Sequence, residues 1–415
     1  MAASIDQLRR AQANNIVVGT LNTIHPRKEI DKFVLDVDTC NLFLIALTEL
    51  QDQRLEEDPW SWFGISAIRG LPYQAWQRIN QQSAIDAGQY PAWDSDDLDP
   101  RLWQGASHRD GDPERGYCPT SSVLFAPWHR PYLAMMEQAI FLKMLDIANR
   151  YESVNDRKRY ENAAKIFRLP YFDPFAARVL LEPDMKRPLK WQCGIPQILS
   201  SHEVRVCRPE DPKFYNPIPN PLYSYQFAIT KQGNPPVSTP KYAFDDTPPF
   251  HWTRLWFDNN VPIPTGNAVT PNVRTARSPN GWDGMSNHSR LQSHFELSMM
   301  GAGMRLYRTL ADPIVKYEQF AYTQYWRSRT DAEPDGGPKP NPSNEAWYGS
   351  IEDFSNAVHS WLGAAERTGE VHTETRRLPG GGEIRYTTRG QYPPCGHMRK
   401  QEYSSFDPIY WLHYW

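Results

Sequence analysis

The sequence predicts a mainly α-helical domain that carries long proline-rich loops. Apolar residues recur at helical spacing in several segments of the 415-residue chain, which is the first indication of this fold class. The chain also contains 37 prolines, 15 tryptophans and 21 tyrosines, a composition typical of irregular loops that pack against a core. No internal repeat divides the sequence, so we expect residues 1–415 to form a single domain.

Residues 26–55 predict a helix of the core, because apolar side chains recur there every three or four positions. These side chains are Leu42, Ile45, Ala46 and Leu50. Residues 61–76 are rich in aromatic side chains and are interrupted by glycine and proline. This composition predicts a turn that opens toward another helix.

The strongest helical pattern of the chain begins at Phe125 and extends over residues 125–153. Pro131 is expected near the start of this helix, where the missing N–H costs least. The apolar stripe of the helix consists of Tyr132, Met136, Ala139, Ile140 and Leu145. A shorter helix is predicted over residues 156–167, before an extended segment.

The prolines of residues 175–285 predict a loop-rich insertion, because proline is excluded from helix interiors and central strands. The tryptophans and tyrosines within it indicate that the insertion packs onto the core. Helical spacing returns at residues 285–330 and at residues 347–363. Residues 378–390 then predict a glycine-rich hairpin, and residues 396–415 predict the start of a last helix.

The composition also excludes several classes of partner and location. A formal net charge of −3, from 45 basic and 48 acidic residues, gives no case for nucleic-acid binding. No apolar run reaches the roughly 18 residues that span a bilayer, and the polar N-terminal segment lacks a signal-peptide pattern. The five cysteines are scattered and odd in number, so we expect free thiols in a soluble cytoplasmic protein.

The eleven histidines include no HxxxH pair, so no helix face is predicted to present two imidazoles one turn apart. Neither a GxSxG motif nor a phosphate-binding glycine loop stands out. Seven histidines are expected to be ordinary core or surface residues: His25, His108, His202, His251, His288, His294 and His372. Spacing alone therefore leaves the chemistry undetermined.

Longer segments, however, resemble those of fungal tyrosinases in order and spacing. In the first half these are KEIDKFVLDVDTCNLFLIALTELQ, WFGISAIRGLPYQAW, YCPTSSVLFAPWHRPYLAMMEQ and FRLPYFDPFA, and in the second half GSIEDFSNAVHSWLG and GHMRKQEYSSFDPIYWLHYW. The chain is thereby similar to the tyrosinase, catechol oxidase and hemocyanin family. This resemblance implies a central helical bundle that holds two copper ions between two helix pairs, each copper ion bound by three histidines.

The ligand positions that the resemblance implies are largely substituted in this chain. At the first copper, Arg69 and Thr120 replace two of the histidines and His129 is retained. At the second copper, Ser355 replaces one histidine, His359 is retained, and Tyr414 stands at the third position unless His413 takes that role. A permanent arginine cation repels a metal cation. We therefore expect no dinuclear copper and no phenol oxidation.

Two interpretations of the retained histidines stay open. His129 and His359 could converge on a single zinc ion, because zinc accepts nitrogen, oxygen and sulfur ligands. Candidates for the third zinc ligand are Cys118, His413 and His397. Alternatively, the two histidines act without metal as a general acid and base, with Arg69 or Tyr414 stabilising the developing charge.

The pattern of lost ligands is similar to that of fungal hemocyanin-like cyclopenases of quinolone alkaloid biosynthesis. That resemblance implies a non-oxidative lyase. It would contract a cyclopenin-type benzodiazepinedione to a viridicatin-type quinolone and release methyl isocyanate, which decays to carbon dioxide and methylamine. The residues expected to contact a small aromatic substrate are Thr120, Phe354, Ser355, Asn356, Tyr410 and Trp411. The alternatives are an inactive binding or scaffold protein, and another zinc-dependent step on an aromatic secondary metabolite. The sequence leaves the oligomeric state open.

Overall fold

The structure of the protein is a computed structural model that describes somewhat less than three fifths of the chain. The described residues are 4–20, 24–55, 58–70, 76, 118–120, 122–180, 190–227, 229–232, 237–240, 274–278, 286–289, 291–292, 303–304, 306–307, 309–311, 316–321, 350–363, 371–377, 383–389, 396–399 and 401–414. Within these residues, no helix is both long and apolar enough to cross a membrane.

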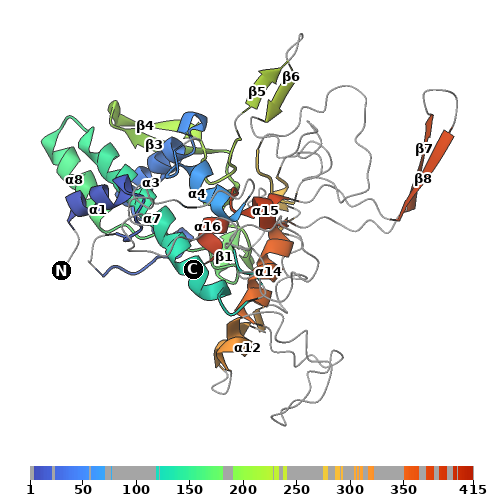
Figure 1. The fold of residues 1–415 in the computed structure, drawn as a ribbon. Helices are drawn as coiled ribbons and strands as arrows, with labels where there is room; N and C mark the ends of the chain where they lie inside the picture. The colour runs from blue at the N-terminus through green and yellow to red at the C-terminus, as the bar shows by residue number, and fades with distance from the viewer. Residues whose placement is uncertain are drawn as a thin grey trace, which may run out of the picture.

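Three helices form the core of the fold: α3 (Val37–Leu50), α7 (Phe125–Asn149) and α8 (Val154–Lys165). They pack against one another in all three pairs (Figure 1). The sequence pattern predicts all three, although the segment expected as one helix over residues 26–55 is divided. The short helix α2 (Ile30–Phe33) precedes α3, and the 3-10 turn η1 (Gln53–Leu55) follows it.

Pro131 lies inside α7 and not in its first turn, because the helix already begins at Phe125. A proline at this depth removes one helical hydrogen bond, so the expectation of a nearly cost-free position was wrong.

The N-terminal helix α1 (Ile5–Ala13) is capped at its N-terminus by a capping box of Ser4 and Gln7. Its Leu8 is fully buried in the hydrophobic core.

Aromatic pairs join the helices of the core. The Phe43 ring of α3 stacks on Phe167 at 5.7 Å, and Phe33 meets Phe43 edge-on at 5.2 Å between ring centroids. The rings of Tyr151 and Tyr160 stack at 4.2 Å and so connect the end of α7 to α8. Such pairs add to the energy of burial alone.

The helix α4 (Trp62–Arg69) lies within residues 61–76, where the sequence predicts a turn that opens toward another helix, so the predicted turn was wrong there. Ser61 caps the helix, since its Oγ accepts a hydrogen bond from the Gly64 amide at 3.0 Å. A Cβ at Gly64 would lie 2.5 Å from the Asp58 carbonyl oxygen, so this glycine allows a close backbone approach. Arg69 is the last residue of α4 and is buried.

The proline-rich insertion contains more strand than expected. Antiparallel hairpins are formed by β1 (Ala177–Leu180) with β2 (Lys190–Cys193), by β3 (Glu203–Arg208) with β4 (Asp211–Pro219), and by β5 (Ile229–Gln232) with β6 (Val237–Pro240). Each described sheet has only two strands, so every strand is an edge strand. Edge strands tolerate proline, which explains how β4 accommodates several of them.

Described residues of the insertion contact the core. Asn41 of α3 pairs with the backbone of Cys207 in β3, donating to its carbonyl at 2.9 Å and accepting from its amide at 2.7 Å. Arg178 of β1 is buried against Glu29, with a nitrogen–oxygen distance of 2.6 Å. Both contacts join the insertion to residues that precede it by more than a hundred positions.

The second half of the chain supplies the helix α14 (Ile351–Leu362), which the sequence predicts, and the short helix α12 (Tyr317–Ala321). The strands β7 (Val371–Arg377) and β8 (Glu383–Arg389) form an antiparallel hairpin, which begins before the hairpin predicted over residues 378–390. The predicted glycine-rich turn lies outside the described residues. The terminal segment folds as three short pieces: η4 (His397–Arg399), α15 (Gln401–Ser404) and α16 (Tyr410–His413). Most of the helical pattern at residues 285–330 lies outside the described residues.

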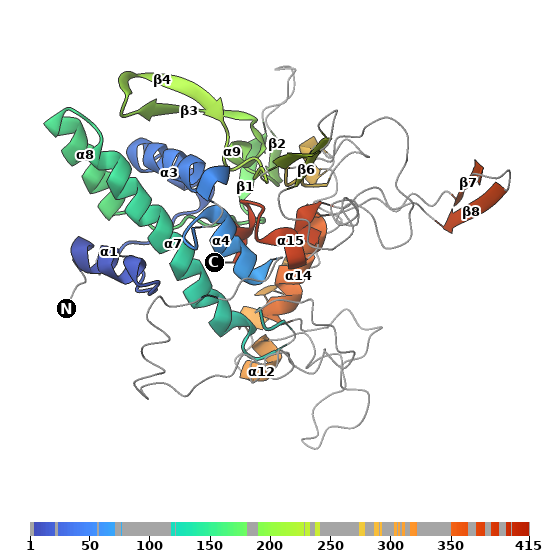
Figure 2. The ribbon, with the colours of Figure 1, turned by 45° about the horizontal axis from the view of Figure 1, so that its top comes forward.

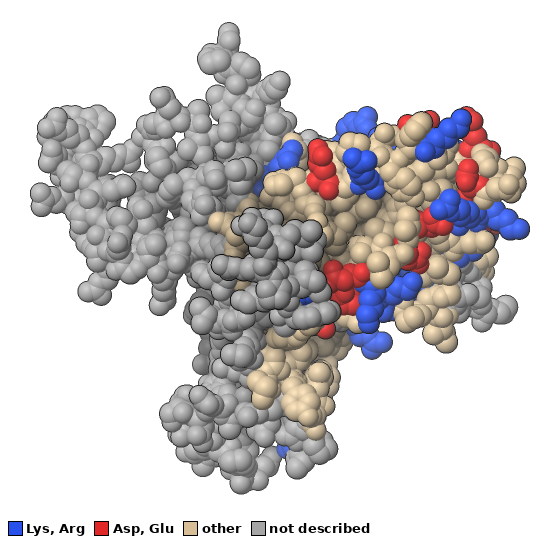
Figure 3. Space-filling model, turned by 180° about the vertical axis from the view of Figure 1, so that it is seen from behind, with Lys and Arg blue, Asp and Glu red and all other residues tan. Residues whose placement is uncertain are grey.

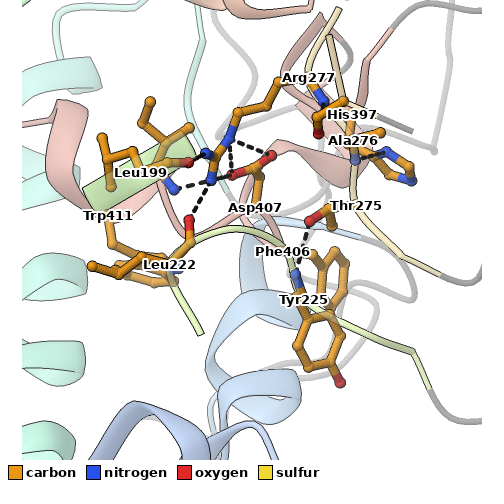
Figure 4. Close-up of polar contacts among 12 residues, drawn as sticks. Leu199, Leu222, Tyr225, Thr275, Ala276, Arg277, His397, Phe406, Asp407 and Trp411 are labelled. Carbon is orange, nitrogen blue, oxygen red and sulfur yellow. Dashed lines mark hydrogen bonds and ion pairs between the residues drawn. The ribbon is translucent and has the colours of Figure 1, made fainter. Parts of the chain in front are cut away.

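A fully buried ion pair holds this terminal segment in place (Figure 4). The guanidinium of Arg277 donates to Asp407 through Nε at 3.0 Å and through Nη2 at 2.7 Å. The same guanidinium donates to the carbonyl oxygens of Leu199 and Leu222, each at 2.7 Å. Asp407 also accepts from the Ile409 amide at 3.0 Å. The pair therefore ties the insertion to the segment that carries α16.

Three cysteines, Cys40, Cys118 and Cys207, are buried free thiols, as the sequence predicts. The side chains of Cys193 and Cys395 lie outside the described part of the chain. On the face shown in Figure 3, basic and acidic side chains alternate over the described residues. Exposed pairs such as Arg159 with Asp38 belong to this kind of surface, and each contributes little stability.

Candidate active site

Four side chains from separate elements converge at one buried place. Arg69 ends α4, His129 lies in the second turn of α7, His359 belongs to α14, and Tyr414 follows α16. In both ribbon views the C-terminus lies between α4, α7 and α14 (Figures 1 and 2). The structure thus brings together the four residues that the sequence analysis names as catalytic candidates.

Tyr414 and His359 form a hydrogen-bonded pair at the centre of the site. The Tyr414 hydroxyl lies 2.8 Å from Nε2 of His359, and Nδ1 of His359 lies 2.7 Å from the Met398 carbonyl oxygen. A carbonyl only accepts, so Nδ1 carries the proton and donates to it. In the neutral imidazole, Nε2 is then the acceptor, and the Tyr414 hydroxyl donates to it.

His129 has a similar arrangement with a different partner. Its Nδ1 donates to the Phe125 carbonyl oxygen at 2.7 Å, which leaves Nε2 as the acceptor, 3.7 Å from Sγ of Cys118. The His129 ring also stacks on Tyr414, with centroids 4.1 Å apart and an interplanar angle of 8°. Tyr414 therefore contacts both retained histidines, which come from opposite halves of the chain.

Arg69 places a permanent positive charge beside these groups. Its Nη2 donates to the Tyr414 hydroxyl at 3.1 Å, and its Nη1 donates to Oγ of Ser404. The guanidinium carbon lies 4.7 Å from the ring centroid of Tyr410 and 5.7 Å from that of Tyr414, both within cation–π range. Only 3% of the Arg69 surface is exposed.

Burial and the Arg69 charge together set the protonation of the site. Burial is the largest cause that lowers the pKa of His129 and of His359 well below 6.5, and Arg69 lowers both further. Burial raises the pKa of Tyr414 to about 12 and of Cys118 to about 11, while Arg69 acts in the opposite direction on both. At neutral pH the imidazoles are therefore uncharged, and the phenol and thiol keep their protons.

The buried histidines predict a stability that falls on acidification. Burial lowers the pKa of His397 and His413 to about 3, and of His129 and His359 well below 6.5. Below pH 6.5 the unfolded chain binds protons that the folded chain does not, so the free energy of unfolding decreases as the pH falls toward about 3. Each histidine contributes a slope of up to about 1.4 kcal/mol per pH unit. Above pH 6.5 this contribution is constant.

Urea unfolding at a series of pH values measures this slope. The variant His413→Gln removes one of the titrating groups, so its unfolding free energy should depend less steeply on pH than that of the wild type. Equal slopes in the two proteins, or a flat profile between about pH 4.5 and 6.5, would contradict the prediction.

Two further residues of the site, Glu352 and Ser404, were not predicted from the sequence, although helical spacing indicates the first of them. Glu352 lies three positions before Ser355 and seven before His359, which places all three on one face of α14. Only 1% of Glu352 is exposed, and its charge raises the pKa of Cys118 and Tyr414. Ser404, which accepts from Arg69, has no local signal because it comes from a distant segment.

The predicted substrate contacts and His413, a candidate metal ligand, are distributed unevenly. Ser355 and His413 join the site, since Oγ of Ser355 lies 3.2 Å from Nε2 of His413. Phe354 is half-buried at the edge of the site, with its ring 6.2 Å from that of His413. Tyr410 is fully buried beside Arg69 and Tyr414.

Three predicted residues do not lie in the site as expected. Asn356 is exposed on the outer side of α14, because it is one position removed from the buried Ser355. Trp411 packs in the core against Trp62, and its indole N–H donates to the Ser405 carbonyl oxygen at 2.9 Å. Thr120 is only partly buried, and its described contact is a backbone bond to Cys118.

His397, one of the candidates for a third metal ligand, is used elsewhere. Its Nδ1 accepts a hydrogen bond from the Ala276 amide at 3.1 Å, beside the Arg277 pair (Figure 4). Its ring packs against Phe227 and Tyr403. This histidine therefore helps to attach the terminal segment to residues 274–278.

A helical core with buried histidines from both halves of the chain agrees with the tyrosinase-like class that the sequence predicts. The family model described as the common central domain of tyrosinase matches residues 59–414. The chain therefore belongs to the tyrosinase family.

The relatives of this chain include tyrosinases of two fungi. The tyrosinase of Podospora anserina is 27% identical over 379 residues, which cover 91% of this chain and 47% of that protein. The tyrosinase of Neurospora crassa is 27% identical over 380 residues, covering 90% and 39%. The chain thus spans about half the length of these relatives or less.

Solved structures show the same fold. A copper-depleted mutant of the active tyrosinase of Aspergillus oryzae superposes with a TM-score of 0.59 at 20% identity, covering 96% of this chain and 81% of that chain. The corresponding complex with L-tyrosine gives a TM-score of 0.60 at 20% identity, with 96% and 80% covered. The mainly α-helical fold class predicted from the sequence is confirmed.

Tyrosinase-family proteins normally hold a dinuclear copper centre, but the donors of this site do not fit one. Each imidazole Nε2 already faces a side chain of the protein: Cys118 for His129, Tyr414 for His359, and Ser355 for His413. Arg69 adds a cation among them. Within the described residues, no three His, Cys, Asp or Glu side chains are grouped to hold a metal ion. The zinc ion predicted on His129 and His359 is therefore not supported either.

We expect the purified chain to contain neither copper nor zinc in stoichiometric amounts, because its nitrogen donors are engaged and a buried cation lies beside them. Plasma mass spectrometry of protein prepared without added metal measures this directly. Dialysis against a chelator should also leave the thermal unfolding midpoint unchanged. Two copper ions per chain, or one firmly bound zinc ion, would contradict this expectation.

Proposed function

We propose that the chain is a non-oxidative, ring-contracting lyase. It converts a cyclopenin-type benzodiazepinedione to a viridicatin-type quinolone and releases methyl isocyanate, which decays to carbon dioxide and methylamine. The observation that carries the proposal is the hydrogen bond of 2.8 Å between the Tyr414 hydroxyl and His359. The Arg69 guanidinium donates a second hydrogen bond to the same hydroxyl. The family resemblance implies that Arg69 and His359 stand at copper-ligand positions, as does Tyr414 unless His413 takes that role.

The proposed reaction involves no net electron transfer, so it needs proton donors and acceptors in place of a redox pair. The Tyr414 hydroxyl holds a proton at a pKa of about 12 and can donate it to a developing oxyanion. Nε2 of the neutral His359 is the adjacent base that can take up a proton. Arg69 stabilises negative charge on the Tyr414 oxygen or on a substrate oxygen close to it.

The surroundings of this pair favour an aromatic substrate. The rings of Phe125, His129 and Tyr410 lie within 6.1 Å of the Tyr414 ring, measured between centroids. Phe354 extends this aromatic surface from α14 toward Phe175. Aromatic side chains with a few placed polar groups are typical of small-molecule sites.

A second candidate function is phenol oxidation, which the names of the relatives favour. They are called tyrosinase or polyphenol oxidase. This alternative requires copper to displace the Tyr414 and Cys118 contacts of the two histidines. An inactive binding protein would retain the fold and show neither activity.

One assay separates these possibilities. The full chain is incubated with cyclopenin, and viridicatin and methylamine are measured by liquid chromatography with mass spectrometry. In parallel, the copper-treated chain is incubated with L-tyrosine and oxygen. Viridicatin formation without oxygen uptake would support the lyase. Oxygen consumption with L-tyrosine and no viridicatin would contradict the lyase and support a phenol oxidase. No product in either assay would contradict both enzymes and support an inactive binding protein.

A further inference from the structure

Tyr410 is the tyrosine of the site whose hydroxyl has no hydrogen-bond partner within the described part of the chain. Its side chain is fully buried. The neighbouring tyrosines differ in this respect. The Tyr132 hydroxyl donates to the Ile65 carbonyl oxygen at 3.0 Å, and the Tyr414 hydroxyl is bonded to both His359 and Arg69.

This hydroxyl belongs to the site by its position. The ring of Tyr410 lies 4.6 Å from that of Tyr414 and 6.0 Å from that of His359, between centroids. The Arg69 guanidinium carbon lies 4.7 Å from the Tyr410 centroid. Tyr410 is thus in contact with the residues proposed to move protons.

A buried hydroxyl without a partner is unusual, because it loses its hydrogen bonds to water without replacement. Arg69 and the neighbouring tyrosines surround this phenol, and burial raises its pKa well above 10, so it keeps its proton and remains a donor. The Nε2 acceptor of His359, whose ring lies 6.0 Å from that of Tyr410, is already engaged by Tyr414. The group that completes the site must therefore bring an acceptor of its own.

We infer that the Tyr410 hydroxyl donates a hydrogen bond to a carbonyl or epoxide oxygen of the aromatic substrate. Tyr410 then positions the substrate beside the Tyr414–His359 pair. It does so through a hydrogen bond as well as through the apolar surface of its ring. The inference rests on the proposed function for the identity of the substrate.

The test compares Tyr410→Phe with Tyr132→Phe in the full chain. Both variants remove one buried hydroxyl, but within the described residues only that of Tyr132 has a hydrogen-bond partner in the protein. The urea midpoint should therefore fall in Tyr132→Phe and stay constant or rise in Tyr410→Phe. The dissociation constant of cyclopenin, measured by calorimetry, should rise about tenfold in Tyr410→Phe and stay constant in Tyr132→Phe.

The outcomes distinguish this inference from the proposed function. An unchanged dissociation constant in Tyr410→Phe would overturn the anchoring role alone. A fall in its urea midpoint as large as that of Tyr132→Phe would do the same, because the hydroxyl would then be bonded without ligand. Cyclopenin binding to the wild type without conversion would overturn the proposed function alone. Absence of any binding to the wild type would overturn both.

Discussion

Replacement of Arg277 by methionine should lower the free energy of unfolding by about 3–5 kcal/mol. Both Arg277 and Asp407 are fully buried, and the substitution leaves the Asp407 carboxylate in the core without its cation. The carbonyl oxygens of Leu199 and Leu222 lose their donor as well. Urea unfolding followed by tryptophan fluorescence measures the loss.

Two further variants test whether the loss of stability comes from burial of the unpaired Asp407 charge. Arg54→Met removes an arginine that is 89% exposed in its pair with Asp52, and it should leave the urea midpoint unchanged. Arg277→Met combined with Asp407→Leu removes both buried charges and should recover part of the loss. If Arg277→Met unfolded at the wild-type midpoint, the pair would not hold the terminal segment. If the double variant were no more stable than the single one, the unpaired charge would not be the cause.

Helical periodicity predicted the core of the fold because apolar residues recur at helical spacing over several turns of these helices. The long helix from Phe125 and the helix at residues 351–362 are examples. The segment at Trp62–Arg69 was missed because it is buried all round and includes Gly64, which lowers helix propensity. Its glycine is required by the close approach of the Asp58 backbone, a contact that local sequence does not reveal.

The site was predictable only in part, because its residues come from distant parts of the sequence. Family resemblance identified Arg69, His129, His359 and Tyr414, which the structure places together. It did not show that the histidine nitrogens face other side chains, because hydrogen-bond partners depend on three-dimensional packing. The Arg277–Asp407 pair was not foreseen for the same reason, as 130 positions separate the two residues.

Replacement of Tyr414 by phenylalanine should reduce kcat for viridicatin formation by about 10²–10⁴-fold, the range typical of a lost general acid or base. The substitution removes the hydroxyl between Arg69 and His359 and retains the ring that stacks on His129. The unfolding midpoint should change much less than the rate, because the ring still fills its place. Steady-state kinetics and thermal unfolding on the same preparation provide both values.

Two further variants show whether Tyr414 and His359 act as one unit, and a third serves as a control. His359→Ala should cause a loss of similar size, and the double variant should be scarcely slower than either single one, because removing one member already disables the pair. If the fold-loss in kcat of the double variant were the product of the two single losses, the two residues would act independently.

The control Tyr151→Phe removes a buried hydroxyl that donates to the Cys207 carbonyl oxygen at 2.7 Å, outside the site. It should lower stability and leave kcat unchanged, which separates the loss of a proton donor from the loss of any buried phenol.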